Sequence, residues 1–414
     1  MTKTSSSILY PESQWNRTTN HAWLLRLGEK VFAKLLEGVS IGSLKLGFLD
    51  GTIHSFGQSG SEPAAVMQLH HPRAGLRICL GGDVGLAESY MDGDWSTPNL
   101  VKVLELGPRN YEEIEQKLLG WYPLRILNLL KHLKRPNSKR GSRRNIADHY
   151  DLGNDFYQLW LDPGMTYSSA WFESGKETLQ QAQCNKYQKI AEKLRLHAGQ
   201  RVLEIGCGWG GFAEFATREY GCHVTGVTLS REQHDYAKTR IRNAGLQDHV
   251  ELRLQDYREL SGSFDRIVSI EMLEAVGERH WETYFTQLRN LLNPSGEVVI
   301  QTILVNDQRY ECYRKSGDFI KLYVFPGGML PCDQILQQVI NRTGFQQIEQ
   351  EKFGEAYATT LALWNRTFQE QWLTIQRLGF DQRFKRLWEY YLAYCEVGFR
   401  TQAIDVAFYH LKPC

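Results

Sequence analysis

The 414-residue sequence lacks several features that would assign it to a distinct class of protein. Its eight cysteines include no C-x-x-C pair and no metal-site spacing, which predicts free thiols, a reducing compartment and no bound metal. The formal net charge is only +1, so no overall field attracts nucleic acid. No apolar run approaches the roughly 18 residues of a membrane span, and the first residues lack the apolar core of a signal peptide. We therefore expect a cytoplasmic protein that contacts a membrane only peripherally.

Acidic residues are also absent from residues 116–147, a region that carries nine lysines and arginines. Residues 118–130 are apolar with aromatic members, and residues 135–142 have the Pro, Ser and Gly content of a linker. An apolar helix followed by a basic segment suits the anionic inner surface of a membrane. A core helix followed by a solvated linker explains the apolar half equally well. For the basic linker, residues 131–145, we favour membrane contact.

The chain length predicts two or three domains. Residues 1–16 are polar and expected to be loose. Within residues 17–130, a helical pattern at 21–36 is followed by alternating apolar segments and glycine-rich turns, which predicts a small α+β domain. The cluster GLAESYMDGDW at 85–95 is interpreted, on composition alone, as a packed turn and helix start.

A strand, a glycine turn and a helix follow one another in residues 201–216. Residues 201–205 (RVLEI) have the composition of a short buried strand, and four glycines fall among the next six residues. Such a turn opens a ligand site at the carboxyl edge of an α/β sheet, where a ligand must approach bare backbone. The spacing fits the dinucleotide pattern G-x-G-x-x-G, but no acid follows the second strand to hold a ribose. An acid directly before the glycines, Glu204, instead resembles motif I of the class I S-adenosylmethionine methyltransferases.

Strand and helix patterns alternate through the predicted second domain, residues 146–414. That alternation predicts a doubly wound α/β fold with a parallel sheet, completed by a helical insertion at residues 356–394. The strands predicted after the glycine turn are residues 222–227, 250–253, 264–270, 297–302 and 404–411.

Ordered blocks from residue 85 to residue 413 resemble one family, the cyclopropane fatty acid synthases and mycolic acid methyltransferases. The blocks are GLAESYMDGDW (85–95), HYDLGNDFYQLWLDPGMTYSSAWF (149–172), VLEIGCGWGG (202–211), VTGVTLSREQ (224–233), LQDYREL (254–260), FDRIVSIEMLEAVG (264–277), FIKLYVFPGGMLP (319–331) and YYLAYCEVGFRTQAIDV (390–406). The resemblance implies a class I (Rossmann-like) methyltransferase domain after a lipid-binding amino-terminal domain. It also implies methyl transfer from S-adenosylmethionine to the cis double bond of an unsaturated acyl chain, often within a phospholipid. Family members are often dimers, so a homodimer is an expectation by analogy.

By position, the resemblance also assigns cofactor-binding residues. The predicted set is Tyr167 and Ser168 for the methionine part, Glu204, Gly206, Gly208 and Gly210 around the glycine turn, Thr228, Leu229 and Gln233 for the ribose, and Asp256 and Tyr257 beside the adenine. Asp256 could instead cap a helix, but its place after a strand favours binding.

The reaction that the resemblance implies requires an aligned alkene and a base. An alkene is a poor nucleophile and must lie behind the methyl carbon, and the carbocation that forms must then lose a proton. In the family, residues that correspond to Glu274 and Tyr357 serve these needs, and cyclopropane-forming members hold bicarbonate as the base. Their bicarbonate pocket also uses a cysteine, a glycine and two histidines. The corresponding residues here are Ser169, Glu271, Ala275 and Gln301.

Four changes in one small pocket argue against bicarbonate as a cofactor, and hence against ring closure. Glu271 and Glu274 are three residues apart at the expected start of a helix, which predicts that they share one face. Two neighbouring carboxylates disfavour double ionisation, which raises the pKa of one. We hypothesise that Glu271 takes the proton in place of bicarbonate, although it could instead face solvent or cap the helix. The predicted catalytic set is Glu274, Tyr357, Glu271, Ser169 and Gln301, and the product is either a cyclopropane or a methylated, ring-free chain.

Two other functions compete with acyl-chain methylation. Some proteins of similar fold methylate the nitrogen of small amines, but the amino-terminal domain and the basic linker argue against that activity. A lipid carrier without catalysis is the second alternative, and the intact glycines with Glu274 and Tyr357 argue against it.

Overall fold

The computed structural model describes residues 22–111, 113 and 152–414. The chain divides into two compact units, Met1–Ile126 with Gln382–Tyr390, and Leu127–Asp381 with Tyr391–Cys414. We call them the amino-terminal unit and the carboxyl-terminal unit. The predicted loose terminus (1–16), the apolar segment (118–130) and the basic linker (131–145) lie outside the described residues. Within the described part of the chain, no helix is long and apolar enough to cross a membrane.

The amino-terminal unit is the predicted small α+β domain. Its four-stranded sheet has the order β2-β1-β3-β4, with β1 and β3 parallel and the other pairs antiparallel. One face of the sheet is buried, because the apolar side chains of β1 and β3 alternate with exposed ones. Its elements are α1 (Ala22–Leu36), β1 (Ser43–Gly47), β2 (Ile53–Gly57), β3 (Ala64–Leu69), α2 (Arg73–Met91), β4 (Trp95–Ser96) and α3 (Leu100–Arg109).

Helices α1 and α2 approach each other closely at two glycines. A Cβ atom on Gly75 would lie 2.9 Å from the carbonyl oxygen of Gly28, so neither helix tolerates a side chain there. Helix α2 is also broken at Gly82, whose φ of +59° is outside the helical range. A second helical segment therefore starts after Gly82, and the cluster 85–95 continues it to Met91 and then turns into β4, which agrees with the predicted packed turn and helix start.

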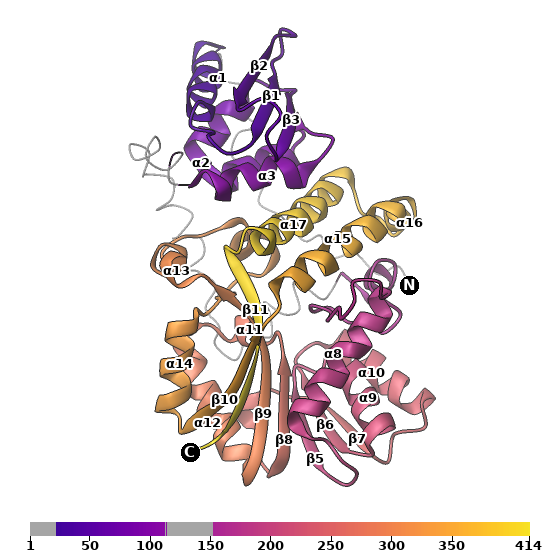
Figure 1. Cartoon of the computed structure of the whole chain (residues 1–414). Coiled ribbons are helices and arrows are strands. Elements are labelled where there is room, and N and C mark those ends of the chain that lie inside the picture. Colours follow the sequence, from indigo (N-terminus) through magenta and orange to yellow (C-terminus); the bar gives the residue numbers. More distant parts are fainter. Residues whose placement is uncertain (1–21, 112, 114–151) are drawn as a thin grey trace. The chain divides into compact units, whose positions relative to one another are not determined.

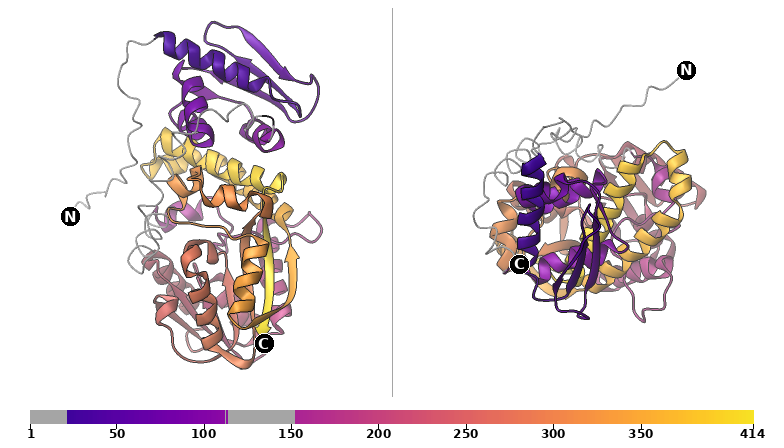
Figure 2. Two further views of the ribbon diagram at one scale, coloured as in Figure 1. Left: turned by 90° about the vertical axis from the view of Figure 1, so that its left-hand side faces the viewer. Right: turned by 90° about the horizontal axis from the view of Figure 1, so that it is seen from above.

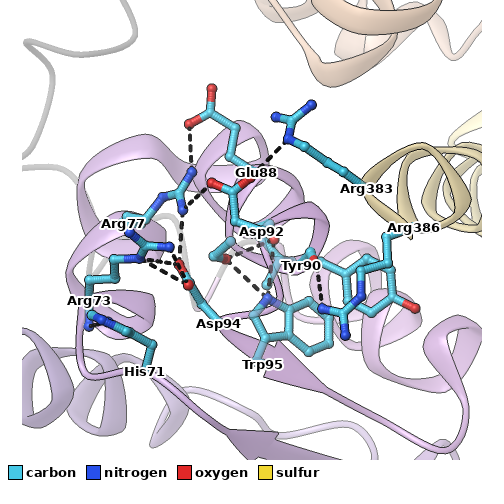
Figure 3. A network of polar contacts seen from close by, with 12 residues as sticks. His71, Arg73, Arg77, Glu88, Tyr90, Asp92, Asp94, Trp95, Arg383 and Arg386 are labelled. Atoms are coloured by element: carbon cyan, nitrogen blue, oxygen red, sulfur yellow. Dashed lines mark hydrogen bonds and ion pairs between the residues drawn. The ribbon is translucent and has the colours of Figure 1, made fainter. Parts of the chain in front are cut away.

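A buried arginine organises that turn (Figure 3). Arg77 is almost fully buried, and its Nη1 donates to carboxylate oxygens of Asp92 and Asp94, each at 2.9 Å. Glu88 lies 3.4 Å from Nη2, and Arg73 donates to Asp94 as well. A buried charge is tolerated only when it is paired in this way, so the acidic residues of the cluster are structural.

The carboxyl-terminal unit is built on a seven-stranded sheet with the order β10-β11-β9-β8-β5-β6-β7 (Figure 1). All neighbouring pairs are parallel except those made by β11, which runs antiparallel to both β9 and β10. The strands are β5 (Arg201–Ile205), β6 (His223–Thr228), β7 (Val250–Leu254), β8 (Phe264–Ile270), β9 (Leu292–Val305), β10 (Phe345–Lys352) and β11 (Ile404–Pro413). Strand β10 was not predicted, and the antiparallel direction of β11 departs from the expected parallel sheet.

Helices flank this sheet and lie beyond the carboxyl ends of its parallel strands. In Figure 1, α8 to α10 group on one side and α12 with α14 on the other, while α15 lies over the carboxyl edge, as Figure 2 also shows. The predicted insertion consists of α15, α16 and α17, although the first part of α17, Gln382–Tyr390, belongs to the amino-terminal unit. The helices are α7 (Asn154–Gln158), α8 (Leu179–Leu194), α9 (Gly211–Tyr220), α10 (Arg231–Asn243), α11 (Leu273–Val276), α12 (Trp281–Leu291), α13 (Asp307–Arg314), α14 (Asp333–Arg342), α15 (Gly354–Glu370), α16 (Trp372–Arg377) and α17 (Gln382–Arg400), with shorter turns at Tyr257–Glu259, Glu278–His280 and Ile320–Val324.

Candidate active site

The glycine turn leaves the carboxyl end of β5 and enters α9. Gly206 and Gly208 have φ values of +84° and +51°, which glycine adopts without a steric cost. The backbone N–H groups of Gly206 and Cys207 both donate to the Val227 carbonyl oxygen, which fixes the turn against β6. A Cβ atom on Gly208 would meet no protein atom within 4 Å, so bare backbone faces open space.

That open space belongs to a cavity at the carboxyl edge of the sheet. Its wall includes Glu204 from β5, the glycine turn, the ends of β6 and β7, and the segment 165–168. Glu204 is 3% exposed, and burial raises its pKa to about 8. No hydrogen-bond partner for its Oε2 exists among the described residues. An unsatisfied carboxylate oxygen in a cavity wall fits a ligand that carries an ammonium group.

Glu271 also lines the cavity, directly after β8, the strand next to β5. Its φ of +50° is an uncommon backbone conformation for a residue with a side chain. Oε1 accepts hydrogen bonds from the backbone N–H of Ser169 at 2.8 Å and from Nε2 of Gln301 at 2.7 Å. Oε2 accepts from the hydroxyl of Tyr357 at 2.6 Å. Burial raises the pKa of Glu271, and these donors oppose the rise because they favour the ionised carboxylate.

Glu274 is a second buried carboxyl group, on the short helix α11. Its Oε1 accepts from the backbone N–H of Ile303 at 2.6 Å and from Thr302 Oγ1 at 3.0 Å. Its Oε2 has no partner among the described residues. Burial, and then the charge of Glu271, raise the pKa of Glu274 to about 8. Three donors favour the ionised form of Glu271 and only two favour that of Glu274, so the contacts favour the charge of the pair on Glu271.

A family model described as mycolic acid cyclopropane synthetase matches residues 137–409. The chain is 38% identical over 374 residues to the tuberculostearic acid methyltransferase of Mycobacterium tuberculosis, covering 88% of this chain and 86% of that protein. It is 37% identical over 353 residues to the cyclopropane-fatty-acyl-phospholipid synthase of Escherichia coli, covering 84% and 87%. The chain therefore belongs to the mycolic acid cyclopropane synthetase family.

Solved structures agree with that assignment. A mycolic acid cyclopropane synthase solved with SAH and CTAB superposes with a TM-score of 0.61 at 31% identity, covering 65% of this chain and 97% of that one. Coclaurine N-methyltransferase has a TM-score of 0.60 but only 18% identity, which shows a shared fold alone. This member of the synthetase family is an S-adenosylmethionine-dependent methyltransferase, and Glu204 with the bare glycine turn fits that cofactor.

Most of the predicted cofactor-binding residues line the cavity. They are Tyr167, Ser168, Glu204, Gly206, Gly208, Thr228, Leu229, Gln233 and Tyr257. Gly210 and Asp256 are not part of the wall. A Cβ atom on Gly210 would lie 3.1 Å from Cβ of Ala237, so this glycine allows α9 and α10 to pack. Asp256 is 1% exposed and caps the turn Tyr257–Glu259 by accepting from Arg258 N, with two further bonds from the Arg258 guanidinium. Gln255 and Arg258 line the cavity beside it instead.

The predicted catalytic residues come together in the structure, but the contact made by Ser169 and the backbone of Glu271 differ from the expectation. Ser169 contributes its backbone N–H to Glu271, whereas its hydroxyl donates to the Ala170 carbonyl oxygen. Helix α11 begins only at Leu273, so the prediction that Glu271 and Glu274 share a helix face is wrong. They come together because Glu271 turns back toward β9 through its left-handed backbone.

Two residues near the site were missed by the sequence interpretation. Gln183 and Lys186 on α8 are 1% and 0% exposed, and both donate to Ser168. A pattern was available to find them. The buried positions of α8 are Ala182, Gln183, Lys186, Tyr187, Ile190, Ala191 and Leu194, so Lys186 lies within the apolar stripe of an amphipathic helix.

Proposed function

We propose that this enzyme methylates the double bond of unsaturated acyl chains in membrane phospholipids and that Glu271 is its proton acceptor. The observation that carries the proposal is the carboxylate of Glu271, which three donors hold at the cavity wall. The names of the two relatives, a tuberculostearic acid methyltransferase and a cyclopropane-fatty-acyl-phospholipid synthase, support the substrate class.

Different residues of the cavity would bind different parts of the cofactor. Glu204 and Ser168 would hold the methionine part of S-adenosylmethionine, and Thr228 with Gln233 would hold its ribose. When bound, the cofactor supplies a methyl group that is already activated by its sulfonium. The protein's main task is then to align the alkene, and such positioning is worth up to roughly 7–11 kcal/mol.

Glu271 meets the requirements of the base. A base must be ionised, and each of its oxygens already accepts at least one hydrogen bond that favours the charge. After methyl attack on the alkene, a C–H bond next to the carbocation breaks, its electron pair enters the product, and the proton moves to Glu271. The resemblance to cyclopropane-forming proteins assigns that step to bicarbonate, but the side chain of Glu271 occupies the position of the glycine in that pocket.

The fixed position of this base bears on the product. Bicarbonate is a separate molecule, whereas the Glu271 carboxylate is tied to Gln301 and Tyr357 and reaches only the protons in front of it. We propose that it removes a proton from the acyl chain and leaves a methylated alkene instead of a ring. Cyclopropane and methylated alkene are isomers, so proton NMR of the product lipids, and not mass, distinguishes them.

Support for a lipid surface comes from the basic segment of the sequence. Nine cations and no acid lie between Lys117 and Arg144, outside the described residues, and each cation near an anionic membrane is worth about 1 kcal/mol. An anionic phospholipid surface is therefore part of the proposed substrate.

The test compares Glu271→Gln with wild type in bicarbonate-stripped buffer, on vesicles of an unsaturated anionic phospholipid. Wild type should remain active, and Glu271→Gln should lose about 10²-fold or more in kcat because the amide keeps the shape without the basic oxygen. Glu274→Gln is the matched comparison. Its loss should be smaller, because burial and the charge of Glu271 raise the pKa of Glu274 to about 8 and so make it the weaker candidate for an ionised base at neutral pH. A wild-type enzyme that stops without bicarbonate, together with an active Glu271→Gln, would restore bicarbonate as the base.

A further inference from the structure

Lys186 is a fully buried cation beside the active site. It extends from α8, and among the described residues its Nζ makes one hydrogen bond, to Ser168 Oγ at 2.7 Å. Three buried carboxyl groups face it from three other parts of the unit, namely Glu271, Asp162 and Glu204. Burying an ammonium group without a directly bonded carboxylate costs free energy. We therefore expect its charge to have a function.

The contacts of Lys186 lead to the proposed base. Gln183, one turn earlier on α8, donates to the Ser168 carbonyl oxygen at 2.9 Å, so α8 holds Ser168 at two points. The next residue along the chain, Ser169, donates its backbone N–H to Glu271 at 2.8 Å. A continuous series of contacts therefore runs from the Lys186 ammonium through residues 168 and 169 to the Glu271 carboxylate.

We propose that Lys186 is a positioning residue that keeps Glu271 ionised and correctly oriented, through its charge and through its hold on Ser168. This inference rests on the proposed role of Glu271 as the base. A carboxylate in a dry site protonates unless donors or cations favour its charge. The hydrogen bonds of Glu271 supply the donors, and Lys186 supplies the cation.

The charge of Lys186 also serves the end of the cycle. When Glu271 has taken the proton from the acyl chain, it is neutral, and it must release that proton before the next turnover. A cation nearby favours the ionised carboxylate and so favours this release. The cofactor cannot supply this charge, because its sulfonium becomes a neutral thioether on methyl transfer.

Other titratable groups face this pair, and each bears on its pH response. Tyr357 from α15, Glu274 from α11 and Cys395 from α17 face Glu271. Besides the three carboxyl groups, the exposed Cys184, two residues earlier on α8, acts on the charge of Lys186, and the Lys186 Nζ lies 4.9 Å from the ring centre of Tyr187. Arg240 acts on Asp162 and Glu204 from α10. Burial lowers the pKa of Lys186 to about 8, and the three carboxyl groups oppose that fall, so Lys186 is charged at neutral pH.

The experiment is the pH dependence of kcat for Lys186→Met, which removes the charge and preserves most of the length. The pKa of Glu271 rises without the cation, so the acid limb of the profile should move to higher pH. The loss in kcat should then be at least about tenfold greater near pH 6 than near pH 9. A structural defect alone would lower kcat by one factor at every pH. Calorimetry with S-adenosylhomocysteine verifies that the cofactor site is folded.

Two further variants make the result unambiguous. Ser168→Ala removes the hydroxyl partner and leaves the Lys186 charge, so kcat should fall without movement of the acid limb. If Lys186→Met does not fold, Lys186→Gln serves the same purpose, because it also lacks the charge. Glu271→Gln, assayed in parallel, tests the proposed function separately. An inactive Glu271→Gln together with an unmoved acid limb in both Lys186 variants overturns the role of Lys186 alone, whereas an active Glu271→Gln overturns the base itself.

Discussion

Replacing Glu271 by glycine should convert the site of the proposed base into a vacant anion site. The substitution removes the side chain and relieves the backbone, because glycine adopts a φ of +50° freely. It leaves the Ser169 N–H, the Gln301 amide and the Tyr357 hydroxyl around the space that the carboxylate occupied. Those three donors are suited to a small oxyanion.

The magnitudes can be worked from these contacts. Left-handed backbone costs a residue with a side chain roughly 1–2 kcal/mol, which the glycine recovers. Each buried donor left without an acceptor costs about 1–3 kcal/mol, and three donors lose theirs. The variant should therefore be less stable than wild type in the absence of an anion. An anion at about 100 times its Kd would return about 2.7 kcal/mol.

The assay follows kcat and the unfolding midpoint of Glu271→Gly against bicarbonate, formate and chloride. In bicarbonate-stripped buffer kcat should fall by about 10²–10⁴-fold. Bicarbonate should raise both kcat and Tm of the variant, while neither changes in wild type. Formate, a smaller carboxylate, should have a weaker effect, and chloride, which is not a base, should restore no activity. A variant that is as active as wild type without any added anion would falsify the assignment of Glu271 as the base.

Two further predictions concern other parts of the chain. Gly208→Val should abolish S-adenosylhomocysteine binding in calorimetry because its side chain enters the cavity. Gly245→Val, at an exposed glycine with a φ of +71° and the same backbone strain, should bind normally. Equal affinity of the two variants would remove the glycine turn from the cofactor site. Arg77→Met should destabilise the full chain by about 1.5–3 kcal/mol in denaturant unfolding, because it removes charged hydrogen bonds from Asp92 and Asp94, whose remaining ion-pair partners among the described residues are Arg383 and Arg73. Arg109→Met, which removes a partly exposed ion pair with Glu105, should cost at most about 1 kcal/mol, and similar losses would mean that the Arg77 network is not a structural centre.

The parts of the fold that local patterns encode were predictable from the sequence. Strand β8 was predicted at residues 264–270 within the alternation of strand and helix patterns, and the structure confirms those bounds. The glycine turn was recognisable because positive φ values demand glycine. Strand β10 was missed because its sequence, FQQIEQEK, is polar, and only Phe345 is buried in it. An edge strand with one buried residue has no apolar alternation from which to predict it.

The site was less predictable because its contacts connect distant parts of the chain. Ser169, Gln301 and Tyr357 are 102, 30 and 86 residues from Glu271, and no spacing rule links them. The resemblance to a known family named these residues, but it could not show that Ser169 acts through its backbone N–H. Side-chain type carries no information about that group. Lys186 was missed for a different reason, because a lysine in a polar helix is usually solvated.

The two carboxyl groups of the site differ in ways that assign them different tasks. Glu271 accepts three hydrogen bonds over both oxygens, and a buried cation faces it from α8. Glu274 accepts through one oxygen only, and its other oxygen has no partner among the described residues. Environments that push the pKa values of two neighbouring carboxyl groups apart allow one to act as a base while the other stays protonated. The left-handed backbone of Glu271 aims its oxygens at the three donors. In the proposed mechanism this fixed carboxylate takes the proton, and Glu274, whose pKa is raised to about 8 by burial and by the charge of Glu271, keeps a second negative charge out of the same site.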